Sequence, residues 1–568
     1  MTTEKLWIRR IAAVLTCWLM VMGTYGARAK IEWRTYVQPD GTVLTLTLWG
    51  NADFNCYRDG QGRMYSRDSQ GVFHLLPAEQ TRHQEETVMT RSDFGSLNYA
   101  KMDWDPNRTY RQLVVLLSFS DCDFSMDDPQ ATYDAMFNQS GYNQRNGAGC
   151  VADYFRDQSG GQFNLKFDVY GPFKVNAQVK TGSSSRNEGR SSFRSATQAL
   201  MTAYPDLDFS PYDWDGNGRV EQVIYVYAGY SGNQASIVDQ GYTWPTTGSF
   251  SSISTPDNHT ISNYSASGEL WTNNTSCGIG TICHEFSHSL GLPDVYPTSS
   301  SVEAMSIVDE WDLMDGGHFT NRGWCPPNYS PLEKMLLGWL TPTELTKDTT
   351  ITGLKPIAEG GEAYIIRHTD NEFYLLENRQ WKGWDYGLPG RGLVVYHVYY
   401  NQGRWQGNTV NNVNGKPYYS LVPADNLDYM GWYNLIMARG GKNPYADTQQ
   451  RLNSAILGTA AYPWQTDSTD FVNRELTSTS TPATQMYDAD DTGSTMLTKS
   501  ITDITQNDDG TVSFVFHANG ESGIKTPEIK AGRYGIYTLT GRKLRADAAI
   551  GDLPKGIYII NGKKVVRR

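Results

Sequence analysis

The sequence predicts an α/β or α+β domain followed by an all-β module, and two stretches of the chain support this order. Up to about residue 345, apolar strand-like runs at 110–119 and 223–228 alternate with a helix-like stretch at 192–204. Beyond residue 346, glycine-rich turns separate short strand-like runs, among them 363–366, 373–376 and 392–398. The 568 residues are enough for roughly three or four domains of ordinary size.

The first 29 residues have the composition of a secretory leader. A basic start at 5–10 precedes an apolar run at 11–22, and Ala27 and Ala29 supply the small residues that a signal peptidase requires. A membrane anchor is the alternative, but the run is shorter than the ~20 residues that span a bilayer. We therefore expect residues 1–29 to be cleaved and the protein to be secreted, with no transmembrane segment.

Charge and cysteine content narrow the class of protein further. The net charge of -12 argues against nucleic acid as a partner, because phosphate binding needs a basic surface, whereas an acidic surface suits calcium. Six cysteines follow the leader, too few for a disulfide scaffold of this length. Cys277 and Cys283 are the closest pair, and a local bridge between them is plausible.

The pattern His284-Glu285-x-x-His288 predicts a zinc site on a helix. Residues four apart lie on one helical face, so both imidazoles can reach one ion, while Glu285 projects beside them as a general base. Zinc takes three protein ligands plus an open position in catalytic sites, where it activates a water. On these residues alone, a pair of surface histidines is the alternative.

The residues that follow weigh against that alternative. Gly291 can end the helix and reverse the chain, which brings Asp294 back to the same ion as the third ligand. A methionine, Met314, lies in the glycine-flanked run 311–317, although a methionine in such a place is more often simple packing.

The complete string resembles the zinc motif of the metzincins, in the variant that ends in Asp294. The likeness narrows to secreted metallopeptidases of the immune inhibitor A type and spans roughly residues 109–425. It is carried by the motif, by the acidic loop at 213 and by the segments 153–160, 169–172, 311–317, 331–339, 376–380 and 388–397. It implies an α+β catalytic domain with a mixed sheet and an active-site helix, in which Met314 forms the methionine turn.

Two positions depart from the family pattern. Ser287 stands where glycine is usual, a small change. No tyrosine follows Met314 at the position that assists the metal in some metzincins, so the oxyanion stabiliser stays unassigned apart from zinc.

These observations predict five parts of the chain: a signal peptide at 1–29, a β-rich propeptide at 30–108, a metzincin-like catalytic domain at 109–345, a β-sandwich-like module at 346–520 and a β tail at 521–568. The polar stretch 79–91 would be the cleavable linker of a zymogen. Cys56 or Asp53 could hold the zymogen latent by ligating zinc, and Cys56 could equally be a buried thiol or a disulfide partner.

The loop at 213–221 predicts a calcium site. Its oxygen ligands alternate as in the first part of an EF-hand loop, but residue 224 is Ile where that loop needs a bidentate Glu. An ion-free turn rich in Asp and Asn is the alternative. The expected ligands are Asp213, Asp215, Asn217, Arg219 through its backbone carbonyl, and Glu221.

Other polar and aromatic residues are weaker candidates. His318 and His397 are better explained as structural or substrate-pocket residues, because three metal ligands are already assigned. The cluster Trp381, Trp384 and Tyr386 could bind substrate, but core packing is the better explanation.

The tail from about 522 resembles a sorting domain of the type IX secretion pathway, with a Gly-Ile-Tyr strand at 556–558 and a basic end. A plain β extension is the alternative. A sorting domain would imply export across an outer membrane, with possible retention at the cell surface.

The sequence as a whole predicts a secreted zinc metalloendopeptidase that acts on extracellular proteins as a monomer. Two rivals remain. One is a binding module with a decayed active site, although such a module has no need of Glu285. The other is a surface protein with structural zinc, which usually has four protein ligands.

Overall fold

The structure is a computed structural model that describes residues 26–52, 55–77, 104–181, 189–234, 236–438, 456–465, 472–490, 492–520, 536–538, 543–545, 555–560 and 563–567. The chain divides into two compact units, residues 1–518 and residues 519–568. Residues 1–25 of the predicted leader, Asp53 and the whole of the predicted linker 79–91 lie outside the described residues.

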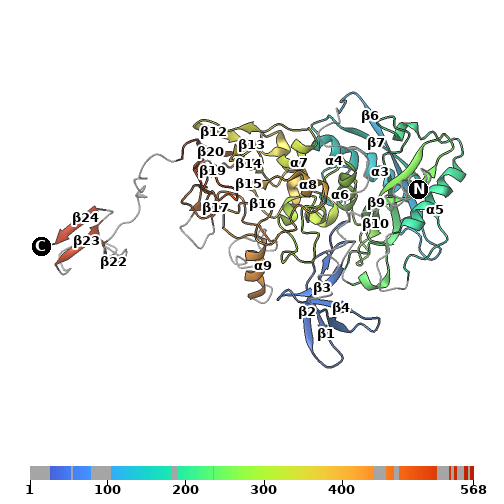
Figure 1. Cartoon of the computed structure of the whole chain (residues 1–568), viewed down its shortest axis with the longest axis horizontal. Coiled ribbons are helices and arrows are strands. Elements are labelled where there is room, and N and C mark those ends of the chain that lie inside the picture. The colour runs from blue at the N-terminus through green and yellow to red at the C-terminus, as the bar shows by residue number, and fades with distance from the viewer. Residues whose placement is uncertain are drawn as a thin grey trace, which may run out of the picture. The chain divides into compact units, whose positions relative to one another are not determined.

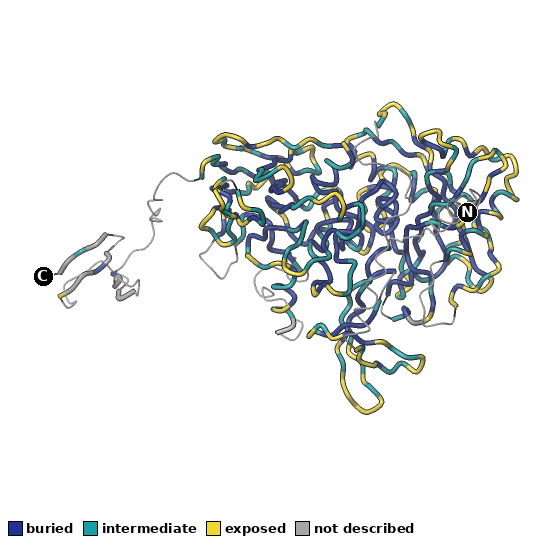
Figure 2. The backbone as a smooth tube through the Cα atoms, in the orientation of Figure 1, coloured by how far each residue is buried: buried dark blue, intermediate teal, exposed yellow. Residues whose placement is uncertain are grey.

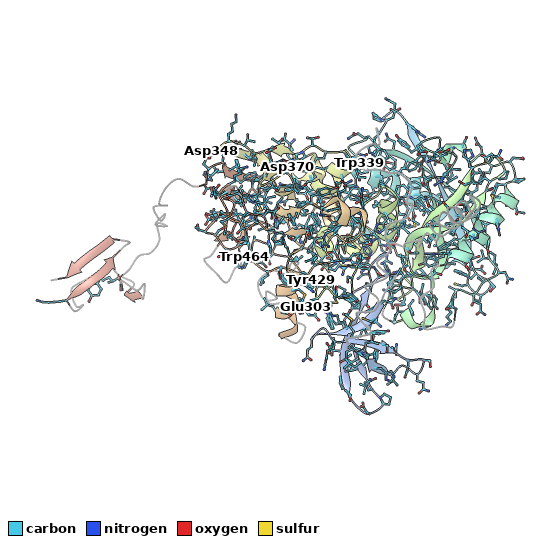
Figure 3. The ribbon with its side chains drawn as sticks, in the orientation of Figure 1. Glu303, Trp339, Asp348, Asp370, Tyr429 and Trp464 are labelled. Carbon is cyan, nitrogen blue, oxygen red and sulfur yellow. The ribbon has the colours of Figure 1, made fainter. Side chains whose placement is uncertain are left out.

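A small antiparallel sheet begins the first unit, as the strand-like segments predict (Figure 1). Its strands follow chain order: β1 Arg34–Val37, β2 Val43–Gly50, β3 Asn55–Asp59, β4 Met64–Arg67 and β5 Phe73–Leu75. One group of its apolar side chains packs against Val238 and Trp244. Another packs against Met305 and Tyr429, so the sheet is anchored on the rest of the unit at two places. Tyr429 and Glu303 mark the second place in Figure 3, where Arg58 donates a hydrogen bond to the carbonyl of Glu303 (2.7 Å).

A mixed five-stranded sheet forms the centre of residues 109–345, the predicted catalytic region, in the order β7-β6-β8-β10-β9. The pairs β6–β7, β6–β8 and β8–β10 are parallel, and the edge strand β9 is antiparallel to β10. This confirms the mixed sheet and the two apolar strands expected from the sequence. The bounds are β6 Thr109–Ser118, β7 Asn164–Lys174, β8 Val223–Tyr230, β9 Thr246–Ser254 and β10 Thr260–Leu270.

Helices cover both faces of this sheet, which explains why its middle strands are apolar throughout. Alternate residues of β6 enter two different cores: Val114 and Leu116 pack in one, and Leu113 and Val115 in the other. Figure 2 shows the buried backbone concentrated here. The second core contains α5 Arg190–Ala203, and the first contains α3 Pro129–Asn138, α4 Val151–Gln158, α6 Gly280–Ser289 and α7 Pro331–Leu336.

Two further sheets follow residue 342 and share a core of their own. The larger one has the order β11-β13-β14-β15-β16, and the smaller one β12-β20-β19. Their bounds are β11 Thr343–Glu344, β12 Thr349–Leu354, β13 Tyr364–Arg367, β14 Glu372–Arg379, β15 Gly392–Tyr399, β16 Tyr419–Leu421, β19 Ser500–Gln506 and β20 Val512–His517. A separate pair joins β17 Trp464–Gln465 to β18 Val472–Asn473.

The sequence predicted an all-β module here, and that prediction is wrong. The described residues of the region also form two α-helices, α8 Gln402–Gln406 and α9 Tyr429–Ala438. The Asn401 side chain caps α8 by accepting the N–H of Arg404 (3.0 Å). Trp432 anchors α9 in the first core. A capped start and an anchored aromatic residue are enough to hold short helices that the glycine-rich pattern did not indicate.

The first core continues across residue 345. It includes Val114 and Phe286 of the catalytic region together with Leu375 and Val394 of the larger downstream sheet. The opposite face of that sheet, with Leu376 and Val395 among others, forms the core shared with the smaller sheet. The downstream sheets therefore bury a catalytic-region surface as well as one another.

A buried ion network strengthens this junction. The Arg379 guanidinium, fully buried, donates two hydrogen bonds to Asp385 (2.8 and 2.5 Å) and one to Glu377 (2.9 Å). It also donates to the backbone carbonyl of Asn328 (3.1 Å), on the other side of residue 345. Burial alone would lower the pKa of Arg379, but the two carboxylates raise it well above its ordinary value.

The described cysteines are all free thiols, so the local bridge considered between Cys277 and Cys283 is absent. Cys283 points from α6 into the first core beside Phe286. The Cys277 backbone is bonded instead to the carbonyl of Glu269 at the end of β10 (2.9 Å). Nearness in sequence does not bring these two thiols together, because the helix start turns one of them into the core.

The second unit holds four described strands in the order β22-β21-β23-β24. They are β21 Ile536–Thr538, β22 Lys543–Arg545, β23 Gly556–Ile560 and β24 Lys563–Arg567, which agrees with the strand-like segments of the tail. Within the described part of the chain, no helix has both the length and the apolar character to cross a bilayer.

Replacing Arg379 by Met tests the junction. The change leaves the buried Glu377 and Asp385 without their cation, so we expect the free energy of unfolding to fall by about 3–5 kcal/mol. Urea denaturation followed by tryptophan fluorescence measures it. Lys174→Ala is the control, because it breaks the exposed Lys174–Asp123 pair and should change stability little. A loss no larger than that of the control would contradict the role given to Arg379.

Candidate metal centre

The helix α6 that carries the motif is buried along its whole length. Its start lies tightly against the loop at 316–323, and glycine makes this approach possible. A side chain at Gly280 would place its Cβ 2.2 Å from the carbonyl oxygen of His318. Gly278, with a φ of 71°, has the left-handed conformation that leads the chain into the helix. The motif therefore sits in a fixed position between the central sheet and this loop.

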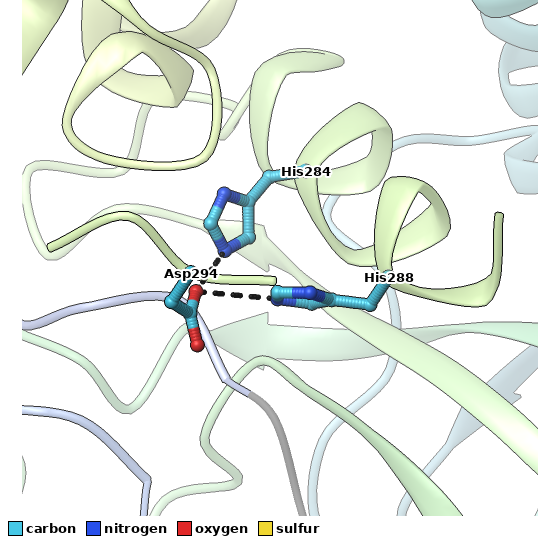
Figure 4. A group of neighbouring side chains, drawn as sticks. All are labelled: His284, His288 and Asp294. Atoms are coloured by element: carbon cyan, nitrogen blue, oxygen red, sulfur yellow. Dashed lines mark ion pairs between the residues drawn. The ribbon is translucent and has the colours of Figure 1, made fainter. Parts of the chain in front are cut away.

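Three predicted ligands converge on one point (Figure 4). Asp294 Oδ1 lies 3.4 Å from His284 Nε2 and 3.3 Å from His288 Nε2. Ligand atoms on a tetrahedral zinc with bonds of about 2.0–2.1 Å lie about 3.3–3.4 Å apart, so the spacing fits that ion. Neither His284 Nε2 nor Asp294 Oδ1 has a hydrogen-bond partner among the described residues, although both are buried. Buried polar atoms of this kind fit a cation as their partner.

Backbone carbonyls orient both imidazole rings. His284 Nδ1 lies 2.8 Å from the carbonyl oxygen of Leu313, and His288 Nδ1 lies 2.8 Å from that of Leu292. Each Nδ1 carries the proton and donates to its carbonyl, which leaves the Nε2 lone pair directed at the ligand cluster. Leu313 precedes Met314, so the predicted methionine turn acts on His284 directly.

Gly291 reverses the chain after α6, as the sequence predicts. Its φ of 98° lies in the left-handed region, and its N–H donates to the carbonyl of His288 (2.9 Å). Two residues beyond Leu292, Asp294 then faces back toward the histidines. Met314 is fully buried, and its carbonyl accepts the N–H of Val295 (3.0 Å), which ties the turn to the third ligand.

A residue of the downstream region holds Asp294 in place. The Asn408 side chain donates to Asp294 Oδ2 (2.9 Å) and accepts the Asp294 N–H (2.7 Å). Oδ2 is thereby occupied, and Oδ1 is left to face the imidazoles. Burial alone would raise the pKa of Asp294, but His288 and His284 lower it below its ordinary value. Asp294 is therefore a carboxylate at neutral pH, the form that binds metal.

Glu285 lies on the same helix, also buried. Burial raises the pKa of its carboxyl to about 7, the range that suits a general base. Its Oε2 accepts the Thr247 hydroxyl of the edge strand β9 (2.7 Å), and Oε1 accepts the backbone N–H of Ala27 (2.7 Å). The hydroxyl of Tyr296 donates to the carbonyl of Gly26 (2.6 Å). Residues 26–27, at the end of the predicted leader, thus lie beside the metal centre.

Sequence reasoning missed Thr247, Tyr296 and Asn408. Thr247 comes from β9, 38 residues before Glu285, and Asn408 lies 114 residues after Asp294. No local sequence pattern marks either residue. Tyr296 stands two residues after Asp294, a spacing that could have been noticed once the third ligand was assigned.

The two lesser histidines have different surroundings. The ring of His318 is fully buried and its centre lies 4.6 Å from that of His284, so it borders the metal centre. Burial, with His284 next, lowers its pKa well below the ordinary value and keeps it neutral. His397 instead pairs with Glu372 in the downstream sheet (2.8 Å) and is structural.

Cys56 does not serve as a zinc-ligating latency residue in this structure. It is buried on β3 among Trp49, Met64 and Met305, and burial raises its thiol pKa to about 12. A metal-ligating cysteine needs the thiolate, which this environment disfavours. Asp53, the other residue considered, is outside the described residues.

The aromatic cluster behaves mostly as core, as favoured from the sequence. Trp384 is nearly fully buried, donates to Asp157 (2.9 Å) and packs edge-on against Tyr154 at 5.1 Å. Trp381 is partly buried, and Tyr386 is 42% exposed.

The three carboxylates among the expected ligands of the calcium loop lie together. Oxygen atoms of Asp213, Asp215 and Glu221 lie within 4.8 Å of one another. The Asn217 side-chain oxygen instead accepts the N–H of Arg219 (2.9 Å). Burial, followed by repulsion from Asp215, raises the pKa of Glu221 to about 7. Three carboxyl groups held this closely would be stabilised by a cation, although backbone N–H groups already occupy both oxygens of Asp213.

Comparison with known proteins agrees with this geometry. Residues 230–337 match the family described as "Immune inhibitor A peptidase M6, catalytic domain", a stretch that holds α6, Asp294 and Met314. The chain is also 20% identical over 273 residues to the pre-pro-metalloprotease PrtV of two strains of Vibrio cholerae serotype O1, M66-2 and ATCC 39315 / El Tor Inaba N16961. These alignments cover 42% of this chain and 29% of each relative. Together the two findings support a metallopeptidase catalytic domain in this chain.

Asn408→Gly tests the support of the third ligand. Glycine tolerates the left-handed φ of 55° at this position, so the change removes the side chain without backbone strain. We expect zinc affinity, measured by competition with a chromophoric chelator, to fall about 10- to 100-fold.

Asn426→Gly is the matched control, because Asn426 is exposed and has a similar φ of 59°. Equal zinc affinity in the two variants would show that Asn408 does not position Asp294.

Proposed function

We propose that this protein is a secreted zinc metalloendopeptidase that hydrolyses peptide bonds of extracellular proteins. The observation that carries the proposal is the convergence of His284 Nε2, His288 Nε2 and Asp294 Oδ1 at zinc-ligand spacing, with Glu285 on the same helix. A structural zinc site usually has four protein ligands. Among the described residues only three metal-binding groups gather here, which favours a site with an open position.

Zinc bound by these three residues would supply a Lewis acid that polarises the scissile carbonyl and lowers the pKa of a water. Glu285 then has two tasks. It takes a proton from the attacking water, and it delivers a proton to the nitrogen of the departing amine. The N–H of Ala27, 2.7 Å from Oε1, indicates that a peptide nitrogen can reach this carboxylate.

Thr247 and Tyr296 complete the set of catalytic groups. The Thr247 hydroxyl fixes Glu285 by donating to Oε2. The Tyr296 hydroxyl donates to the carbonyl of Gly26, a position from which it could stabilise the negative charge that develops on a substrate carbonyl oxygen. This assigns the oxyanion stabiliser that the sequence left open.

The proposal also covers the export, processing and localisation of the protein. Residues 1–29 would be a signal peptide and residues 30–108 a propeptide, so the enzyme would be made as a zymogen and act outside the cell as a monomer. The basic end and the strands of the second unit fit a sorting tail, with possible retention at the cell surface.

Glu285→Gln tests the catalytic role. The variant keeps all three ligands, so it should bind about one zinc per chain by elemental analysis. Casein hydrolysis by the processed protein, freed of residues before about 109, should fall at least ~100-fold, because glutamine cannot accept the proton.

Glu344→Gln is the control, because Glu344 is exposed on β11 and is not among the residues of the candidate metal centre. The same loss should follow treatment of the wild type with a chelator and be reversed by zinc. Hydrolysis by Glu285→Gln at the wild-type rate would refute the mechanism.

We also propose calcium binding at the loop 213–221, supported by the three clustered carboxyl groups. Calcium added to chelator-treated protein should raise the melting temperature, and Asp215→Asn should weaken that effect by removing one charged ligand. Differential scanning fluorimetry measures both. An unchanged melting temperature in the wild type would leave the ion-free turn as the correct interpretation.

A further inference from the structure

The backbone of residues 26–30 is held along its length beside the metal centre. The indole of Trp244 donates to the carbonyl of Ala27 (2.9 Å), and the Asn233 amide donates to that of Arg28 (3.3 Å). The Lys30 N–H donates in turn to the carbonyl of Asn233 (3.1 Å). Hydrogen bonds to successive backbone groups are the usual way in which a protease holds an extended peptide.

The register of this segment follows from its two contacts with catalytic groups. Glu285 Oε1 accepts the N–H of Ala27, and the Tyr296 hydroxyl donates to the carbonyl of Gly26. Both atoms belong to one peptide bond, that between Gly26 and Ala27. In the proposed reaction Glu285 protonates the leaving nitrogen and Tyr296 stabilises the charge on the carbonyl oxygen. The Gly26–Ala27 peptide bond therefore lies where a scissile bond would lie. Arg28 is then the second residue on the amine side of that bond.

Arg28 enters a buried acidic pocket. Its guanidinium forms ion pairs with Asp309 and with Asp315, the latter at 3.3 Å, and only 5% of the residue is exposed. The ring of Phe319 lies 5.8 Å from the guanidinium carbon. Gly316 leaves the space that the guanidinium fills, because a Cβ there would lie 2.0 Å from Arg28 Nη2.

Hydrogen bonds within the catalytic region hold the two carboxylates of the pocket in place. Asp315 Oδ2 accepts three backbone N–H groups, those of residues 307, 308 and 309, each at 3.0 Å, and Oδ1 accepts the Ser306 hydroxyl (2.6 Å). Asp309 has a φ of 49°, in the left-handed region, which directs its carboxylate to the same guanidinium. Burial raises the pKa of Asp309, and repulsion by Asp315 adds to the effect. Two carboxyl groups so placed have a strong electrostatic preference for a cation between them.

We propose that this pocket is the specificity subsite of the peptidase and that it selects an arginine at the second residue beyond the cleaved bond. Arg28 occupies the subsite in the unprocessed chain. The guanidinium matches the two facing carboxylates by charge, and its Nη2 donates to Asp309. A neutral side chain would leave both carboxylates buried and uncompensated. The proposal rests on the proposed peptidase function.

The subsite becomes available by either processing step. Cleavage after residue 29 removes Arg28 with the leader, and cleavage in the 79–91 stretch removes it with the propeptide. The carboxylates of Asp309 and Asp315 remain in both cases, because they belong to the catalytic region.

The test compares two peptides that differ in one charge. Both have the sequence of residues 24–30, Thr-Tyr-Gly-Ala-Arg-Ala-Lys, and the second carries citrulline, a neutral isostere, in place of the arginine. The full chain is folded first and then cut at a site for a specific protease inserted in the 79–91 stretch, so that the catalytic region folds with its propeptide. Affinity is measured by calorimetry on the zinc-loaded Glu285→Gln variant, which binds without cleaving.

We expect the arginine peptide to bind about 10- to 100-fold more tightly than the citrulline peptide, the ratio of a charge-assisted contact to a neutral one. In a variant that carries Asp309→Asn as well as Glu285→Gln, the two peptides should bind with nearly equal affinity. Asparagine tolerates the left-handed backbone at this position. Equal affinities, or binding of neither peptide, would overturn the subsite. The peptide comparison needs no pocket variant, so it decides the matter even if Asp309→Asn does not fold.

Cleavage separates this proposal from the one it rests on. The otherwise wild-type processed enzyme should cleave the arginine peptide with the higher kcat/KM, between glycine and alanine, as mass spectrometry of the products would show. Cleavage of both peptides at one rate would overturn the subsite and leave the peptidase intact. Selective binding of the arginine peptide without any cleavage would support the subsite and refute the peptidase.

Discussion

Two backbone carbonyl oxygens, those of Leu313 and Leu292, set the direction of the imidazole lone pairs at the metal centre. Three neighbouring parts of the structure bring these carbonyls and rings together. The buried helix α6 supplies the rings, the run around Met314 delivers one carbonyl, and the reversal at Gly291 delivers the other together with Asp294. Because each ring is held at Nδ1, the ligand triangle exists through the protein's own hydrogen bonds, and an ion would bind with little rearrangement.

The region after residue 345 is part of this site. Asn408 holds the third ligand, and the Arg379 network joins the downstream sheet to the backbone of Asn328. The similarity to the immune inhibitor A peptidase M6 catalytic domain ends at residue 337, before either support. The ligands therefore lie inside the matched stretch, while Asn408, which holds the third one, lies beyond it.

The sequence predicted what depends on neighbours in the chain. The helix, its two histidines and the reversal at Gly291 follow from spacing, and the strands β6 and β8 follow from unbroken apolar runs. It could not predict Asn408 or Thr247, because their roles arise from contacts across 114 and 38 residues. The possible pairing of Cys277 with Cys283 and a zinc-ligating role for Cys56 failed for the same reason. Burial and direction decide what a thiol does, and sequence distance gives neither.

The asparagines of the 408–414 loop reach back to the segment that follows Asp294. Asn411 donates to the carbonyl of Val295 (2.6 Å), and Asn412 accepts the N–H of Thr298 (2.7 Å). Gene shuffling that moved the motif helix alone into another protein would leave this scaffold behind. The two stretches must be inherited together, so we expect recombination breakpoints in relatives to fall outside the interval that joins them.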